Sequence, residues 1–188
     1  MSTADRKTEN AVAGQTRTNL DMAGLSELHV TIDKRVQSIR DGHADWLCGK
    51  GCDSCCRRLA EIPQLTAAEW HLLQEGLAAL PAESLWEIGR RMAALAGSRP
   101  VVCPLLDRST GACPVYHHRP VACRTYGFYR QRDLGLFCSD IENLAATGAL
   151  DTVVWGNHDV VDRRLAAMGE SRPLTEWFAD WPGKGRGD

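Results

Sequence analysis

Cysteine is the residue type through which this chain could do chemistry. Four of its eight cysteines follow one another closely in the pattern C-x3-C-x2-C-C, at Cys48, Cys52, Cys55 and Cys56. Thiolates bind both iron–sulfur clusters and zinc, and a glycine-rich loop with these gaps lets the backbone present several sulfurs to one centre. Consecutive side chains tend to diverge, so one member of the Cys55–Cys56 pair could serve a second metal, a second iron or the core.

A second set of four cysteines follows at wider spacing. Nine residues separate Cys103 from Cys113 and Cys113 from Cys123, and Cys138 lies beyond them. Clustered thiols favour ligation over scattered, inert core cysteines. We therefore expect all eight cysteines to be metal ligands, either in two four-thiolate sites or in one site with spare thiols. This prediction requires residues 48–56 and 103–138 to converge.

The compartment supports ligation as well. Residues 1–20 lack the apolar block of a secretory signal, and no apolar run approaches the length of a membrane span, so we expect a cytoplasmic protein without membrane contact. Thiols stay reduced there, and structural disulfides are rare. A formal net charge of −2 gives no strong field for nucleic acid. The expected partners are a metal ion or cluster and a redox or protein partner.

The order of these motifs resembles the YkgJ-type cysteine-cluster proteins, which are described as zinc- or iron-chelating. The resemblance lies in the pattern at 48–56, in Cys103-Pro-Leu-Leu, and in the Cys…Tyr-x-x-Arg-Pro-x-x-Cys-Arg element from Cys113 to Arg124. The resemblance implies metal binding, commonly of an iron–sulfur cluster, without one settled activity.

Cationic and imidazole side chains accompany the ligand candidates. A four-thiolate zinc or [4Fe–4S] centre carries about two negative charges, because thiolate is the ligand form. We expect Arg119 and Arg124 to support the centre as cofactor-binding residues rather than as catalytic groups. His117 or His118 could also ligate, although eight thiols leave no need for a histidine. No catalytic residue is identified by the sequence.

Three functions are compatible with these residues. The favoured one is a metal-binding protein, holding an iron–sulfur cluster of the [4Fe–4S] type, in electron transfer or metal and sulfur handling; zinc is the alternative metal. An enzyme would use the centre as Lewis acid or redox site beside an acid–base pair drawn from His117, His118, His158 and Asp159. A zinc-stapled interaction module is the third.

The elements that must position the cysteines are predicted to be helices. Apolar periodicity indicates a helix from Leu20 to His43, after a flexible tail over residues 1–20. Thr66 and Glu69 form a capping-box signature for a helix to about Leu80. The next helix begins at Pro81 and is stopped by Gly97.

Later elements are shorter. Helices are predicted over 139–146, from Asn157 or Asp159 to Met168, and near Trp177, whereas 151–155 is a strand or a turn. Residues 182–188 are predicted to be frayed. The expected fold is mainly α: a small helical domain over 21–181 with two irregular cysteine-rich loops wrapped around a metal centre that staples them.

Overall fold

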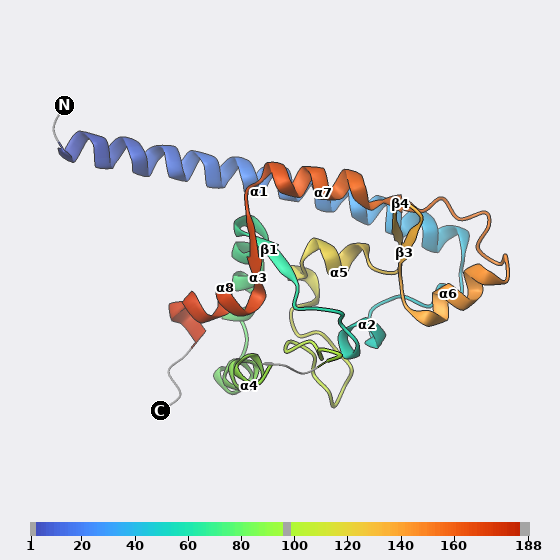
Figure 1. The fold of residues 1–188 in the computed structure, drawn as a ribbon. Coiled ribbons are helices and arrows are strands. Elements are labelled where there is room, and N and C mark those ends of the chain that lie inside the picture. Colours follow the sequence, from blue (N-terminus) through green and yellow to red (C-terminus); the bar gives the residue numbers. More distant parts are fainter. Residues whose placement is uncertain (1–2, 96–98, 185–188) are drawn as a thin grey trace.

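The computed structural model describes residues 3–95 and 99–184, which are mainly helical, as predicted. The helices of this part are α1 Thr3–Gly42, α2 Ser54–Arg57, α3 Ala67–Ala78, α4 Ala82–Ala93, α5 Val121–Thr125, α6 Ser139–Ala146, α7 His158–Ala167 and α8 Leu174–Asp180, with 3-10 turns at Tyr116–His118 and Pro182–Lys184. The strands are β1 Gln64–Thr66, β2 Tyr129–Gln131, β3 Leu134–Leu136, β4 Gly156–Asn157 and β5 Ser171–Pro173. Figure 1 shows their arrangement.

Helix α1 is longer than predicted, because it begins at Thr3 and not near Leu20. The sequence of 3–19 is polar, which suggested a tail, but it has no proline and includes Ala, Arg, Lys, Gln and Glu, all good helix formers. Whether this segment is flexible stays a prediction. In Figure 1 the N-terminal part of α1 extends past the other helices. Its C-terminal half buries Leu25, Leu28, Ile32 and Ile39 at helical spacing.

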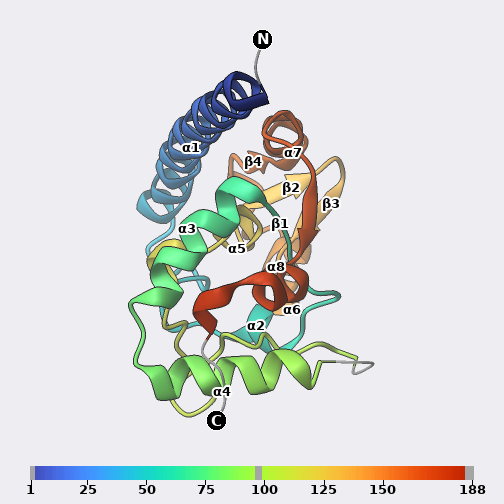
Figure 2. The ribbon, with the colours of Figure 1, turned by 90° about the vertical axis from the view of Figure 1, so that its left-hand side faces the viewer.

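Two hydrophobic cores lie on opposite sides of α3. The first, here called the α1 core, joins α1, α5, α6 and α7 to the β2 strand through residues such as Ile32, Val121, Phe128, Ile141 and Val161. The second, the α4 core, joins α3, α4 and α8 and includes Leu73, Leu77, Ile88, Leu174 and Phe178. Figure 2 shows α1 and α7 on one side of α3, with α4 and α8 on the other.

Helix α3 begins with the predicted capping box. The Glu69 amide donates to Thr66 Oγ1 at 3.3 Å, and Glu69 Oε2 accepts from the Thr66 amide at 2.9 Å. Glu69 is only 3% exposed, and its Oε1 accepts from the Val121 amide at 3.0 Å. Because Val121 opens α5, one carboxylate joins the N-terminus of α3 to the helix that carries Cys123.

Two small sheets join segments that are separated in the sequence. Strand β1 pairs antiparallel with β5, with Leu65 opposite Arg172, and β2 lies between antiparallel β3 and parallel β4. The sequence did not predict these sheets, because strands of two or three residues are too short for a visible alternation. Strand β4 begins at Gly156, immediately after the segment 151–155 that was considered as a strand.

Other predicted elements agree with the structure or fall outside it. Helix α4 follows Pro81, and its predicted stop at Gly97 lies outside the described residues. Helix α6 has the predicted bounds, and α7 is capped by Asn157, whose side chain accepts from the Val160 amide at 3.3 Å. In the predicted frayed end, Pro182–Lys184 forms a 3-10 turn, and 185–188 are outside the described residues.

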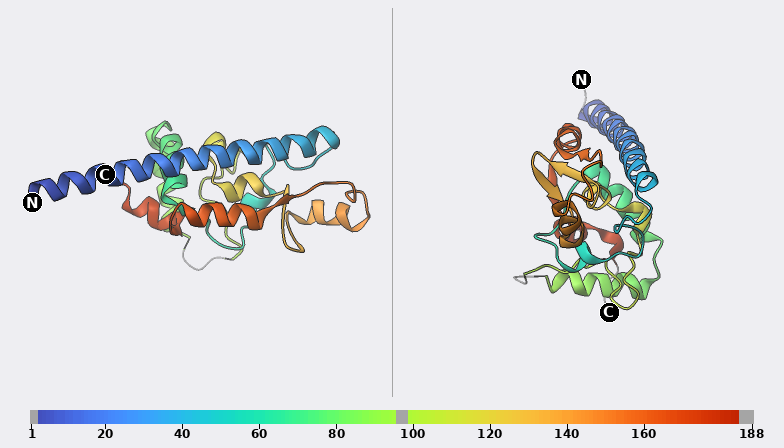
Figure 3. Two further views of the ribbon diagram at one scale, coloured as in Figure 1. Left: turned by 90° about the horizontal axis from the view of Figure 1, so that it is seen from above. Right: turned by 90° about the vertical axis from the view of Figure 1, so that its right-hand side faces the viewer.

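The shape of the molecule follows from these contacts. Figure 3, seen from above, shows α1 running alongside α7 with the shorter elements beneath them. Within the described ranges, no helix is both long enough and apolar enough to cross a membrane.

Candidate metal centre

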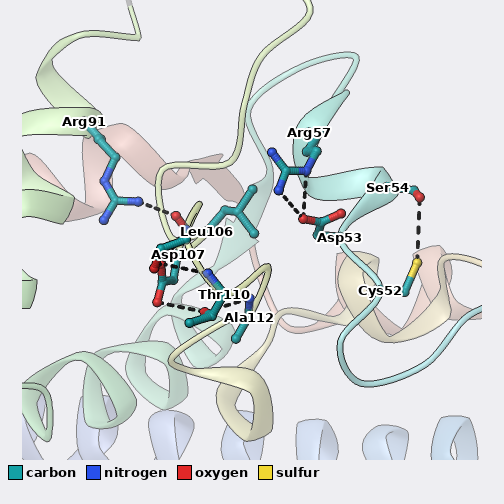
Figure 4. Close-up of polar contacts among 10 residues, drawn as sticks. Cys52, Asp53, Ser54, Arg57, Arg91, Leu106, Asp107, Thr110 and Ala112 are labelled. Atoms are coloured by element: carbon teal, nitrogen blue, oxygen red, sulfur yellow. Dashed lines mark hydrogen bonds and ion pairs between the residues drawn. The ribbon is translucent and has the colours of Figure 1, made fainter.

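The first cysteine segment lies in the loop between α1 and α3. Arg40, near the end of α1, donates to the carbonyl oxygen of Cys48 at 3.2 Å, and the Cys52 amide donates to Gly49 O at 3.1 Å. The short helix α2 then carries Cys55 and Cys56. Figure 4 shows its start, where Arg57 pairs with Asp53 at 2.6 Å and Cys52 Sγ lies 3.8 Å from Ser54 Oγ.

The second cysteine segment returns to the first. The Cys103 amide donates to Cys56 O at 2.7 Å, and Leu59 forms an antiparallel bridge with Val101. The backbone therefore brings together the two regions whose convergence the sequence analysis required.

A tight turn continues this second segment. The Asp107 carboxylate accepts hydrogen bonds from the Ser109 amide and the Thr110 hydroxyl and so closes the turn. Figure 4 shows Asp107 and Thr110 together with the neighbouring contact between Arg91 and the carbonyl oxygen of Leu106. The turn brings Gly111 close to Asp53 of the first segment, since a Cβ on Gly111 would lie 3.1 Å from Asp53 Oδ2. The turn thus holds residues 107–112 against the start of α2.

Four thiols line a small cavity and form what we call the Cys48 group. Cys48, Cys52, Cys55 and Cys138 border a space of about 30 Å³ together with Tyr126 and Gly127. Cys138 enters from the N-terminal end of α6, and Cys48 Sγ lies 3.6 Å from Tyr126 O.

Gly127 sets the size of that cavity. Its φ is +90°, and a Cβ there would lie 2.7 Å from Cys48 Sγ. A side chain at this position would therefore occupy the space beside the sulfur and would also strain the backbone.

The other four thiols, here the Cys103 group, are Cys56, Cys103, Cys113 and Cys123. The pKa of Cys56 is raised to about 12, mainly by a hydrogen bond with Cys103, and the negative charge of a Cys113 thiolate would raise it further. Burial raises the pKa of Cys123 to about 12, with Cys56, Cys55 and Cys113 adding to the shift. Such mutual effects require these thiols to lie close to one another, and Cys55, which also acts on Cys113 and Cys123, lies near them.

Burial acts on the thiols of both groups. It raises the pKa of Cys48 to about 12 and also raises that of Cys113. The pKa of Cys55 is raised as well, mainly by its hydrogen bond with Cys56. These thiols are therefore protonated at neutral pH until a cation displaces the protons, which is the usual coupling of metal binding to proton release.

Arg119 is the cation that serves both groups. Its charge lowers the pKa of Cys48, Cys55, Cys113 and Cys123. The guanidinium is fixed 3.6 Å from the Tyr116 ring centre and donates to Tyr116 O at 3.0 Å and to Cys123 O at 3.3 Å. It is thus placed to offset thiolate charge on either side.

Arg124 makes different contacts. It donates to the carbonyl oxygens of Arg119 and His117 and pairs with Asp33 of α1 at 3.5 Å. Burial lowers its pKa, with Asp33 opposing the shift. Arg124 thus anchors residues 117–124 to α1.

The histidines considered as ligands are held by other contacts. A Cβ on Gly76 of α3 would lie 2.7 Å from the His118 ring, and the His117 ring centre lies 5.6 Å from that of Tyr116. Their positions identify no role for either imidazole as a ligand.

The donor set fits a soft metal. All eight cysteines are free, and Cys52 alone among them is exposed. In the described part of the chain, no three His, Cys, Asp or Glu side chains are arranged around a single ion. In a [4Fe–4S] cluster each thiolate binds a different iron, so its ligands need not point to one atom.

A larger cleft adjoins both thiol groups. Its volume is about 640 Å³, and Cys55, Cys123, Tyr126 and His158 all border it. Burial raises the pKa of Tyr126 to about 12, with Cys55, Cys138 and Cys48 adding to the shift. The cleft wall therefore includes one cysteine of each group.

His158, which borders this cleft, lies beside Asp162, a residue that the sequence analysis did not name. His158 Nδ1 lies 3.1 Å from Asp162 Oδ1, whereas Asp159 accepts from the Arg132 amide at 3.2 Å. His158 Nε2 lies 3.1 Å from Thr125 Oγ1. Because the Thr125 hydroxyl donates to Val121 O at 3.0 Å, its oxygen is left to accept from the imidazole.

Sequence reasoning missed several residues of this region. Tyr126 and Gly127 follow Cys123-Arg124-Thr125 directly, so proximity in sequence was a usable signal. Asp162 stands four residues after His158 in a predicted helix, which places both side chains on one face. No sequence pattern predicted the contact of Arg40 with Cys48, because it depends on the path of the chain after the end of α1.

Together, two sets of free thiols beside two small cores define a mainly helical, cysteine-rich chelating protein. The chain belongs to the CxxCxxCC family, described as "putative zinc- or iron-chelating domain", whose family model matches residues 47–145 and so includes all eight cysteines. This match confirms the resemblance to YkgJ-type proteins. Searches of curated proteins and of solved structures found no match.

Proposed function

We propose that the protein holds an iron–sulfur centre of the [4Fe–4S] type in the cytoplasm and acts in electron transfer or in metal and sulfur handling. The observation that carries the proposal is the meeting of eight free thiols from two chain segments, joined by the hydrogen bond from the Cys103 amide to Cys56 O. When bound, the cluster supplies a one-electron redox couple or a store of iron and sulfide.

Iron–sulfur is favoured over zinc for two reasons. Eight thiols exceed what one structural zinc requires, and the C-x3-C-x2-C spacing at Cys48, Cys52 and Cys55 suits an iron–sulfur cluster. The positive charges of Arg40 and Arg119 lower the pKa of Cys48, and the partial burial of most of the sulfurs limits their contact with water. Both features suit a redox centre, whose potential depends on charge and solvent exposure.

Anaerobic purification tests the proposal. Iron, zinc and acid-labile sulfide are quantified in the purified chain, and the visible spectrum is recorded before and after reduction with dithionite. We expect a brown protein with sulfide equal to iron and a visible band that bleaches reversibly. Colourless protein with zinc and no sulfide would support the zinc-stapled module instead, and protein without either metal would overturn chelation.

A metal-dependent enzyme is the second candidate, favoured by the 640 Å³ cleft that reaches Cys55, Cys123 and His158. An enzyme needs a place where a small molecule can approach the centre, and the cleft offers one with a His158–Asp162 pair beside it. Cyanide, which binds accessible iron, is the probe. A spectral change that disappears in Ala166→Trp, where a large ring fills the cleft, would support the enzyme, and no change would argue against it.

A further inference from the structure

We infer that the eight cysteines form two separate four-thiolate centres, one from the Cys48 group and one from the Cys103 group. The inference rests on the proposed metal-binding function and assigns the ligands: Cys48, Cys52, Cys55 and Cys138 for the first centre, and Cys56, Cys103, Cys113 and Cys123 for the second.

The cavities divide the thiols first. Cys48, Cys52, Cys55 and Cys138 border one small cavity, whose other walls include Tyr126, Gly127 and Ile141. None of the remaining four cysteines borders that space. Three of the four lining thiols come from the first motif, and the fourth comes from the far end of the second segment, so sequence order alone would not group them.

The hydrophobic cores divide the thiols independently. Cys48 and Cys138 pack against the α1 core, whereas Cys103 and Cys113 pack against the α4 core. A metal bound in each group would therefore lie at the edge of a different core. One centre would staple the end of α1 to α6, and the other would staple the second cysteine segment to the α4 core.

The division falls between Cys55 and Cys56. Both lie in the single turn of α2, where successive side chains point about 100° apart, as the helical period of 3.6 residues requires. Cys55 borders the first cavity, while the carbonyl of Cys56 accepts from the Cys103 amide. The Cys55 and Cys56 thiols also share a hydrogen bond, so the two centres would adjoin each other at α2. The adjacent cysteines, awkward for a single site, are thereby explained as one ligand for each centre.

Cys123 completes the second set. It lies on α5 and borders the large cleft, and it is not among the residues that line the small cavity of the first group. Arg119 donates to the carbonyl oxygen of Cys123, and its charge also lowers the pKa of Cys48 in the first group. One cation would therefore be shared by two anionic centres.

Two matched substitutions test the partition. Cys138→Ser removes a ligand of the first centre only, and Cys113→Ser removes a ligand of the second; Ser139→Ala, beside Cys138 and exposed, is the control. We expect each cysteine variant to lose about half of the bound metal and sulfide of the wild type, the double variant to lose nearly all, and the control to lose none.

Differential alkylation with mass spectrometry identifies which thiols are released. In Cys138→Ser we expect Cys48, Cys52 and Cys55 to react while the Cys103 group stays protected, and in Cys113→Ser the reverse. Release of a mixed set in either variant, or a wild type with one centre only, would overturn the partition. Wild type without metal would instead refute the proposed function.

A measurement on the wild type keeps the test decisive if both variants fail to fold. Gradual chelation with pulsed alkylation should release thiols in two sets of four with the membership given above. Release of all eight together, or in sets of other membership, would contradict two independent centres.

Discussion

Gly127 affects both the backbone conformation and the space available beside Cys48. Its φ of +90° and the 2.7 Å from its Cβ position to Cys48 Sγ both oppose any side chain. We expect Gly127→Ala to destabilise the fold by about 1–2 kcal/mol and to lose the metal of the first centre. Metal analysis and urea unfolding measure the two effects.

Gly148→Ala is the control for that substitution. Gly148 has φ +78°, so alanine there carries a similar backbone cost, but its Cβ would meet only the end of the Asp151 side chain at 3.2 Å. We expect a comparable loss of stability with full metal content. Equal metal loss in both variants would show that backbone strain, and not the space beside Cys48, determines binding.

Arg119 and Arg124 were predicted together, but their contacts assign them different effects. Arg119→Gln removes the charge that lowers the pKa of four thiols, and we expect metal affinity to fall about 10- to 100-fold. Arg124→Gln removes an anchor to Asp33 and should lower stability with little effect on affinity. Competition with a chelator of known affinity separates these outcomes, and the reverse ranking would contradict the assignment.

At the scale of elements, the buried Glu69 carboxylate joins α3 to α5. Glu69→Ala removes its bonds to the Thr66 amide and the Val121 amide and leaves two donors unsatisfied, for an expected loss of about 3 kcal/mol. Glu75→Ala, on the same helix with an exposed His71 partner at 3.6 Å, should cost less than about 0.5 kcal/mol. Urea unfolding of both variants checks the contrast, and similar losses would refute the role of Glu69.

The contact of α1 with α5 makes stability depend on pH. Burial lowers the pKa of His29 from 6.5 to about 4, with Arg124 adding to the shift and Asp33 opposing it, and no hydrogen-bond partner is found for its buried Nε2. Below pH 6.5 the unfolded chain binds a proton that the folded chain does not, so stability falls as pH drops toward 4.

His29→Gln tests this dependence. Relative to the variant, the wild type should lose about 1 kcal/mol between pH 7 and pH 5, after allowance for the partial exposure of the imidazole. Because both proteins carry the same thiols, the difference between their unfolding curves at each pH isolates His29. Identical pH profiles would show that the imidazole has the same pKa in the folded and the unfolded chain, and would contradict the prediction.

Across the whole molecule, the metal should hold the two cysteine segments together. The hydrogen bond from the Cys103 amide to Cys56 O links them, while α3 and α4 are held by their own core. We expect chelation to raise hydrogen exchange at Cys103 at least about tenfold and to leave the amides of Leu73 and Leu77 protected. Unchanged exchange at Cys103 would show that the segments meet without metal.

Sequence patterns predicted the elements whose signals are local. The capping box at Thr66, the cap at Asn157 and the bounds of α6 depend on neighbouring residues, and all three agree with the structure. The start of α1 did not, because polarity was interpreted as disorder although helix propensity was adequate. The five short strands left no periodic signal.

In the candidate site, too, features set by neighbouring residues could be predicted, and contacts between distant segments could not. The eight cysteines could be identified from spacing, and their membership in two groups could not, since Cys138 joins Cys48 only through the fold. Asp162 lies four residues after His158 in α7, so helical spacing could have indicated that the two side chains are neighbours. Asp159 was named among the acid–base candidates from the sequence, and Asp162 was not.

The exposure of Cys52 has a consequence for the molecule's durability. Seven of the eight sulfurs are partly shielded, and this one faces water. Oxygen, peroxide or a scavenging thiol would first encounter the protein there, at a single corner of the first centre. Oxidants should therefore damage the first centre before the second. A partly oxidised sample should consist mainly of protein that has lost the first centre and kept the second.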